Sequence, residues 1–211
     1  MKCILTITTS LLLLMLVTRC DRPSVCAQGA GIEWEILNQE VIGLTRGGEY
    51  DRGVVVAKKA LEVAEKNVGP NHPDVATSLN NLAELYRNQG LYAQAEPLYR
   101  RALAIREKAL GLDHPSLATS LNNLATLYDD LAVLACDRSP RAALYDDQGL
   151  YAQAEPLYRR ALVIREKALG PDHPDVATSL ENLAGLYRAT ERDEEAKTLE
   201  KRAARIQAIQ R

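Results

Sequence analysis

The sequence contains no phenylalanine, and its glycines and prolines together number only 21 among 211 residues. Sheet proteins draw on aromatic residues and on turn-forming glycine and proline, so this composition favours helices. Lysine and arginine total 26 against 28 aspartates and glutamates, which leaves no excess of positive charge for a nucleic-acid surface. Apolar residues make up 46% of the chain, enough for one core. We therefore predict an all-α protein that binds no nucleic acid.

The first 27 residues differ from all that follow. Lys2 precedes an apolar and hydroxyl-bearing stretch, residues 3–18, that is shorter than the ~20 residues needed to cross a bilayer. This pattern is typical of a secretory signal peptide, and Val25 and Ala27 suit signal peptidase at the −3 and −1 positions. We predict a signal peptide at 1–27, cleavage after Ala27, and export to a periplasm or out of the cell.

An alternative fate of this leader is lipid attachment at Cys20, which would anchor the protein to a membrane. Arg19 disfavours it, because a lipobox has a small residue in that place. Cleavage after Ala27 would remove three of the four cysteines and leave Cys136 without an intramolecular partner. No disulfide framework is expected, although Cys136 could link two exported chains.

A His-Pro pair organises the rest of the chain. His72-Pro73 recurs 42 residues later at His114-Pro115 and a further 59 residues on at His173-Pro174. The surplus of 17 residues corresponds to 131–147, because Leu-Tyr-Asp-Asp stands both before this segment and at its end. Without that segment the two complete units match at 35 of 42 positions. The sequence therefore contains a duplicated unit with one insertion.

Each unit contains two amphipathic helical patterns. Apolar residues follow the i, i+3, i+4, i+7 spacing over residues 79–86 and again over 95–103. Gly90 lies between them, where a tight turn needs a residue that can adopt a left-handed backbone. The unit is thus predicted to be a helical hairpin. Pro97 and its equivalent Pro156 lie inside the second pattern, which predicts a late helix start or a slight kink.

These positions resemble the tetratricopeptide repeat, and the 42-residue period with its Ala-Leu-Gly-x-x-His-Pro link resembles the kinesin light chain variety. The resemblance implies a right-handed α-solenoid of stacked antiparallel helix hairpins. It covers nearly all of residues 28–211, as one domain of four repeats at about 31–71, 72–113, 114–172 and 173–211. The matching residues of the first complete repeat are Leu79, Leu82, Ala83, Tyr86, Gly90, Tyr92, Ala95, Tyr99 and Ala102.

Residues suited to chemistry are present but not in catalytic patterns. His72, His114 and His173 occupy one equivalent position in successive repeats. Packed helices lie ~8 to 10 Å apart, whereas zinc needs its nitrogens ~2.0 to 2.1 Å from one point. We interpret these histidines as helix-entry residues. The chain has no glycine-rich phosphate loop and no nucleophile elbow, so we predict neither enzymatic activity, nor a metal site, nor a cofactor.

The predicted function is a scaffold that binds a peptide or protein of unknown identity. In the tetratricopeptide family the first helix of each hairpin supplies the concave face, and asparagine amides there suit the backbone of an extended peptide. We expect replacement of Asn80 and Asn122 by alanine to weaken peptide capture without lowering the melting temperature. By register, the partner-binding residues are Asn38, Thr77, Asn80, Glu84, Arg87, Asn88, Thr119, Asn122, Thr126, Asp129, Thr178, Glu181 and Arg188.

Two further interpretations stay open. The polar concave face could be a solvated surface without a ligand, and the protein could instead self-associate through its repeat ends or its insertion. The insertion itself is predicted to extend the first helix of its repeat to about Asp137, with a stop at Ser139-Pro140 and a helical return through Ala142 and Tyr145. It could be a neutral accident of duplication or a contact site, because three leucines are expected to be poorly covered: Leu131, Leu134 and Leu144.

Overall fold

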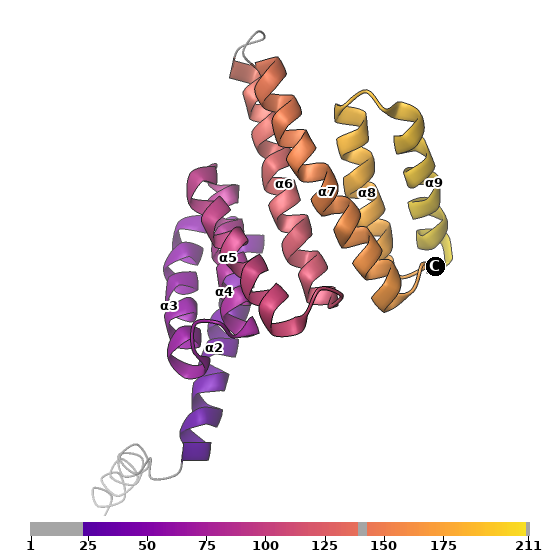
Figure 1. Ribbon diagram of the computed structural model, residues 1–211. Helices are drawn as coiled ribbons and strands as arrows, with labels where there is room; N and C mark the ends of the chain where they lie inside the picture. Colours follow the sequence, from indigo (N-terminus) through magenta and orange to yellow (C-terminus); the bar gives the residue numbers. More distant parts are fainter. Residues whose placement is uncertain (1–22, 139–142, 210–211) are drawn as a thin grey trace, which may run out of the picture.

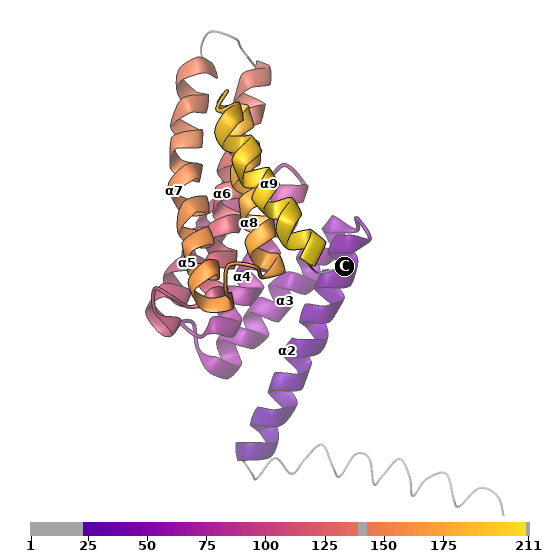
Figure 2. The same ribbon diagram turned by 90° about the vertical axis from the view of Figure 1, so that its right-hand side faces the viewer.

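The computed structural model describes residues 23–138 and 143–209 of the chain, with side chains over 32–135 and 149–209. Every regular element in these ranges is an α-helix, and the helices stack side by side (Figures 1 and 2). In chain order they are α2 (Pro23–Arg46), α3 (Tyr50–Val68), α4 (Pro73–Asn88), α5 (Tyr92–Leu110), α6 (Pro115–Arg138), α7 (Ala143–Leu169), α8 (Pro174–Ala189) and α9 (Asp193–Ile209).

The helices form four antiparallel hairpins that stack in chain order. Each helix contacts the next one along the chain, and α2, α4, α6 and α8 also contact one another in sequence. No two second helices of the described residues approach within 8 Å between Cα atoms. The first helices therefore form the inner layer of a curved stack, and α3, α5, α7 and α9 form the outer layer. The predicted all-α solenoid is confirmed.

The three histidines begin the first helices of the complete repeats. The Nδ1 atom of His72 accepts a hydrogen bond from the backbone N–H of Asp74 at 3.2 Å, and the same bond recurs at His114 and His173. Such a side chain satisfies an amide that has no partner inside the helix. The prediction of helix-entry histidines is confirmed, and their Nδ1 atoms act as acceptors for backbone amides.

Glycines follow both helices of the first complete hairpin, and the turn predicted at Gly90 is confirmed. Gly90, between α4 and α5, has a φ of +74°, and Gly111, after α5, has a φ of +85°. Only glycine adopts such backbone angles at little cost. Pro97 lies inside α5, which begins five residues earlier at Tyr92. The prediction of a late helix start is therefore wrong: the helix forms ahead of the proline.

The core consists of small residues and a few large ones repeated in register. Leu79, Leu121 and Leu180 are equivalent residues of α4, α6 and α8, and all three are fully buried. Tyr99 and Tyr158 are the largest fully buried side chains of the described residues. They supply the large aromatic volume in the core that phenylalanine would otherwise supply. Complete burial of such an apolar side chain contributes about 1.5 to 3 kcal/mol. Each hairpin buries these groups against a neighbouring hairpin.

The insertion lengthens both helices of its hairpin. Helix α6 has 24 residues where α4 has 16, and α7 has 27 where α5 has 19. Each gains eight residues, about two turns, and the pair projects beyond its neighbours in both views (Figures 1 and 2). Helix α6 ends at Arg138, one residue beyond the predicted end.

The burial of apolar side chains in this projecting part of the hairpin differs from the prediction. Leu131 and Leu134 are partly buried, and Leu144 lies outside the described side chains. The exposed apolar side chain is instead Val133, which keeps 52% of its surface accessible. The two leucines are covered because α7 runs beside α6 along the added turns.

Residues 1–22 of the predicted signal peptide lie outside the described residues. Helix α2 begins at Pro23, so the predicted cleavage site after Ala27 falls within the bounds of this helix. From Trp34 onward α2 is tied to the stack, because the indole Nε1 of Trp34 donates to Ser78 Oγ of α4 at 2.8 Å. No helix in the described part of the chain is both long and apolar enough to span a membrane.

Candidate peptide-binding surface

The residues predicted for the concave face come from all four helices of the inner layer. Three of them are asparagines that lie between helices rather than on the surface: Asn38, Asn80 and Asn122 keep only 7%, 4% and 6% of their surface accessible. Asn80 Nδ2 donates to Ser120 Oγ of α6 at 3.1 Å, and Asn38 Oδ1 accepts from Asn81 of α4 at 2.8 Å. The amides of Asn38 and Asn80 therefore join neighbouring first helices, whereas the Oδ1 of Asn122 has no hydrogen-bond partner among the described residues.

This placement corrects one expectation. The double replacement of Asn80 and Asn122 by alanine was expected to leave the melting temperature unchanged, but Asn80 makes a buried hydrogen bond that joins α4 to α6. Loss of such a hydrogen bond costs about 0.5 to 1.5 kcal/mol, since Ser120 Oγ still accepts from Arg106. The position of a residue in the repeat predicts which side of a helix it occupies. It does not predict how closely the next helix approaches that side.

Several other predicted residues have partners within the protein. Arg87 Nε lies 3.4 Å from Asp130 Oδ2 of the next first helix, and Arg188 donates to Glu200 of α9 at 2.7 Å. The remaining contacts of this kind are Thr77 with Arg106, Thr126 with Tyr158, Glu181 with Gln207, and Thr178 with the carbonyl of Pro174 in its own helix. These interactions hold much of the inner face in place.

Five of the predicted residues form no hydrogen bond or ion pair through their side chains among the described residues. Asn122 is one of them and is buried; the other four are at least partly accessible, and they are Glu84 and Asn88 on α4 and Thr119 and Asp129 on α6. These four accessible residues leave polar groups on the inner sides of α4 and α6. Such groups are free to bind a ligand without first giving up a partner in the protein.

The carboxylates on this part of the inner face are difficult to ionise. Burial and the neighbouring charge of Asp130 raise the pKa of Asp129 to about 6. Burial also raises the pKa of Asp130, although the guanidinium of Arg87 opposes that effect. A carboxylate that is partly desolvated beside another carboxylate favours its proton. The region therefore carries negative charge at neutral pH that the protein itself only partly compensates.

Two tyrosines from the outer helices reach toward the same region. Tyr158 donates its hydroxyl to Thr126 Oγ1 at 3.0 Å, whereas the hydroxyl of Tyr99 has no hydrogen-bond partner among the residues that the structure describes. Burial raises the pKa of both phenols, and charges on Arg87 and Asp130 act on both. The two side chains are equivalent in the repeat, so their difference comes from the neighbours each one meets.

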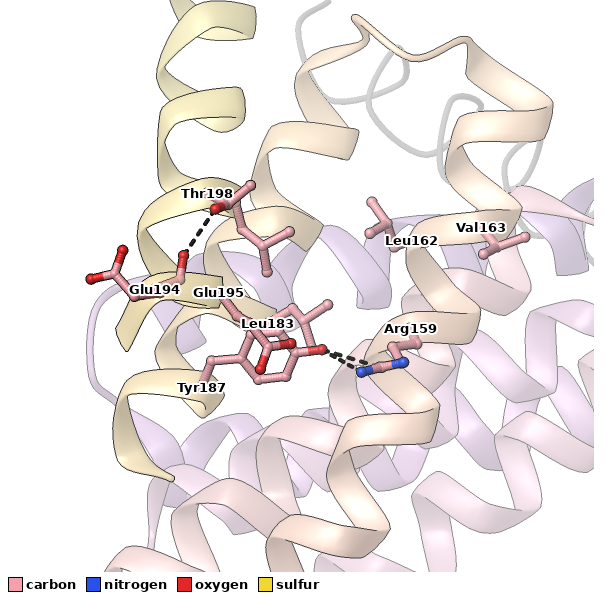
Figure 3. Close-up of a pocket in the computed structure, with 9 residues that line it drawn as sticks. Arg159, Leu162, Val163, Leu183, Tyr187, Glu194, Glu195 and Thr198 are labelled. Atoms are coloured by element: carbon pink, nitrogen blue, oxygen red, sulfur yellow. Dashed lines mark hydrogen bonds between the residues drawn. The ribbon is translucent and has the colours of Figure 1, made fainter. Parts of the chain in front are cut away.

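The outer layer has grooves that the sequence analysis did not predict. One has a volume of about 630 Å³ and lies between α7 and α9, over α8 (Figure 3). An equivalent groove of about 510 Å³ lies between α5 and α7, over α6. In the first, Arg159 donates to the hydroxyl of Tyr187, and Leu162 and Leu199 supply apolar wall (Figure 3). The sequence feature that could have predicted these grooves is an arginine and a tyrosine that recur at the same spacing in successive repeats.

The part of the chain that the structure describes has no group of three or more His, Cys, Asp or Glu side chains that could hold a metal ion. The histidines lie one hairpin apart at the starts of α4, α6 and α8. Their Nδ1 atoms each accept a backbone amide.

Comparison with known families agrees with this architecture. The model of the tetratricopeptide repeat matches residues 37–108, 74–132 and 138–208, which together cover most of the chain. The protein therefore belongs to the tetratricopeptide repeat family, as the sequence predicted. Proteins of this fold generally act as protein-protein interaction scaffolds.

Two curated relatives match a shorter part of the chain. The secreted RxLR effector protein RXLR-C07 of Plasmopara halstedii is 31% identical over 77 residues, 36% of this chain and 24% of that protein. The RxLR effector protein SFI4 of Phytophthora infestans is 32% identical over 77 residues, 36% of this chain and 23% of that protein. The match thus spans about a quarter of each relative.

Solved structures share the fold over more of the chain. BtubC (BKLC) from P. vanneervenii superposes with a TM-score of 0.67 at 25% identity, over 84% of this chain and 64% of that one. The MamA RS-1 ArsTM double mutant gives 0.54 at 16% identity, over 94% of both chains. A Podosopora anserina kinesin light chain structure with nearly identical TPR-like repeats gives 0.46 at 22% identity, over 84% of this chain and 96% of that one.

Proposed function

We propose that this protein is an exported, non-enzymatic scaffold that binds an extended peptide or a segment of a protein on the inner face of its helix stack. The observation that carries the proposal is the set of accessible polar side chains on α4 and α6 that have no partner among the described residues. Asp129 stands out among them, because a half-buried carboxylate without a partner is costly unless a ligand compensates it. Neighbouring ion pairs, such as Arg87 with Asp130, hold the surrounding surface in shape.

Export is supported by the leader and by the relatives. Residues 1–27 have the composition of a signal peptide, and one curated relative is itself named a secreted protein. The mature protein would start at Gln28, within α2. We propose contact with a membrane only if Cys20 carries a lipid. Mass spectrometry of the exported protein would distinguish these fates, since cleavage after Ala27 and lipid attachment at Cys20 leave different N-terminal masses.

The test of partner binding uses matched surface variants. One variant replaces the four partnerless inner residues with alanine: Glu84, Asn88, Thr119 and Asp129. The control replaces three exposed outer-layer residues that make no ion pair within the described part of the chain, Glu62, Lys108 and Lys201. Each purified protein serves as bait for the extracytoplasmic fraction of its host. We expect the wild type and the control to retain the same partner and the inner-face variant to lose it.

Loss of the partner by the control alone would overturn the placement on the inner face. Circular dichroism and melting curves must show that the inner-face variant remains folded, which we expect because none of its four residues makes a hydrogen bond through its side chain. A second candidate function is self-association through the repeat ends or the insertion. Light scattering would support it if the mass rises with concentration, and a dimer on a non-reducing gel would implicate Cys136.

A further inference from the structure

The two near-identical repeats differ at few positions, and the differences gather on the inner face. Seven of 42 positions differ between the units that begin at His72 and His114, once the insertion is removed. Three of the seven lie within five consecutive positions of the first helix, where Glu84, Arg87 and Asn88 of α4 become Thr126, Asp129 and Asp130 of α6. Such clustering on one accessible surface is what divergence of a recognition surface produces.

The charge at one of these positions alternates along the stack. Arg87, Asp129 and Arg188 occupy the same register position of α4, α6 and α8. Both arginines have carboxylate partners, 3.4 Å away at Asp130 for the first and 2.7 Å away at Glu200 for the second. Asp129 has neither an ion pair nor a hydrogen bond from its side chain in the described part of the chain. Of these three equivalent residues, Asp129 is therefore the one whose charge has no partner in the described part of the chain.

A separate observation indicates that this region lacks a binding partner. Tyr99 is fully buried, its hydroxyl has no hydrogen-bond partner, and the charges of Arg87, Glu84 and Asp130 act on it. A buried hydroxyl almost always has a partner. Glu84 and Asp130 against Arg87 leave a formal excess of one negative charge around the tyrosine, and Asp129 beside Asp130 adds a further negative charge to the region. What the region lacks is a cationic group that donates hydrogen bonds.

We propose that the inner face between α4 and α6 binds a lysine or arginine side chain of the extended peptide, with the carboxylate of Asp129 as its ion-pair partner. This proposal rests on the proposed function and adds the chemistry of the ligand. An ammonium or guanidinium group donates several hydrogen bonds and carries the charge that Asp129 lacks. Arg87 pairs with Asp130. Asp129 is therefore the carboxylate that remains to pair with a cationic side chain of the ligand.

The test uses a phage-displayed library of random peptides and four forms of the purified protein. They are the wild type, Asp129→Asn, Asp129→Arg, and the control Asp172→Asn, which makes the same chemical change at an exposed site before α8. We expect peptides enriched on the wild type and on the control to share a Lys or Arg at one position. Asp129→Asn should lose that preference. Asp129→Arg, which restores the residue that α4 holds in this register, should favour Asp or Glu there.

The pH dependence of binding gives a second readout. Affinity for an enriched peptide should fall about tenfold between pH 8 and pH 5, because Asp129 is protonated below about 6 and only its ionised form attracts a cation. The titratable groups that interact with Asp129 are Asp130 on α6 and Tyr158 on α7, and Arg87 on α4 pairs with Asp130 next to them. In Asp129→Asn the change with pH should be at most about twofold.

The outcomes separate the two proposals. Enriched peptides without a shared basic position, or a basic preference that survives Asp129→Asn, would overturn the basic-side-chain proposal and leave peptide binding in place. If no form of the protein enriches any peptide, the proposed function itself is overturned. Melting curves of Asp129→Arg confirm folding, and Arg87 already occupies the equivalent position of α4 without disrupting that helix.

Discussion

Hairpins α4–α5 and α6–α7 share almost all of their sequence but differ in shape. Gln89-Gly90-Leu91-Tyr92 forms the tight turn of the first hairpin, with Gly90 at a φ of +74°. The same four residue types at 148–151 lie inside helix α7. The insertion moved the turn eight residues along each helix, and the glycine that had made the turn became helical. A local sequence with turn chemistry is therefore a turn only where the chain must reverse.

The same comparison applies to the polar faces. Arg87 in α4 pairs with Asp130 of the next repeat, whereas its equivalent Asp129 in α6 has no partner. Tyr99 and Tyr158 are likewise equivalent, yet Tyr158 donates to Thr126 of α6, whereas among the described residues Tyr99 makes no hydrogen bond to Glu84, the equivalent residue of α4. A few substitutions on one face of a duplicated unit thus decide whether its polar side chains have hydrogen-bond and ion-pair partners.

Deletion of residues 131–147 is the largest test of this comparison. We expect α6 and α7 to shorten to the lengths of α4 and α5, with a loss of about 16 helical residues, eight from each helix. The molar ellipticity at 222 nm, compared between the two proteins at equal concentration, measures that loss. A molar signal that does not change on deletion would contradict the helical assignment of the added turns.

The two glycines give opposite results on replacement by alanine. Gly90→Ala should destabilise the protein by about 1 kcal/mol, because a side chain is strained at a positive φ. Gly149→Ala should stabilise it by about 0.5 to 1 kcal/mol, because Gly149 is helical and a Cβ there meets no atom within 4 Å. Urea denaturation measures both. In the deletion protein the sign for Gly149 should reverse, since that glycine again forms the turn.

The paired tyrosines should respond differently to loss of the hydroxyl. Tyr158→Phe removes the hydrogen bond to Thr126 and should cost about 1 kcal/mol. Tyr99→Phe should be neutral or slightly stabilising, because it removes a buried hydroxyl that has no partner. Thermal denaturation of the two variants side by side checks the difference. Equal losses would mean that the hydroxyl of Tyr99 is satisfied in solution.

The smallest expected effect is that of Asp129→Asn on stability. The pKa of Asp129 is raised from 3.8 to about 6 by burial and by Asp130, so ionisation costs more in the folded state than in the unfolded state. Its contribution favours folding fully below about pH 4 and is lost as the pH rises through about 6. Asparagine should therefore stabilise the protein at pH 7 by no more than about 1 kcal/mol, since solvent screens a partly exposed group. Denaturation at pH 4 and pH 7 measures the change, which should vanish at the lower pH.

Much of the fold was predictable from particular residues. The spacing of Leu79, Leu82 and Tyr86 predicted a helix with one buried face, and the histidine-proline pairs predicted where first helices begin. The candidate surface was less predictable. Register placed Asn80 on the inner face, but the distance to α6 decides that it is buried. The outer grooves were missed because they form between second helices that are distant in sequence.

The sequence by itself determined that this protein is a stack of helical hairpins, because the periodic apolar residues of each repeat can be buried only against a neighbouring repeat. The tertiary structure alone decided which polar groups of the inner face are satisfied. A carboxylate or amide next to another helix finds a partner or does not, depending on a few ångströms of separation. No pattern along the chain records that distance. The separation of the helices gives Arg87 a partner, whereas Asp129 has none among the described residues.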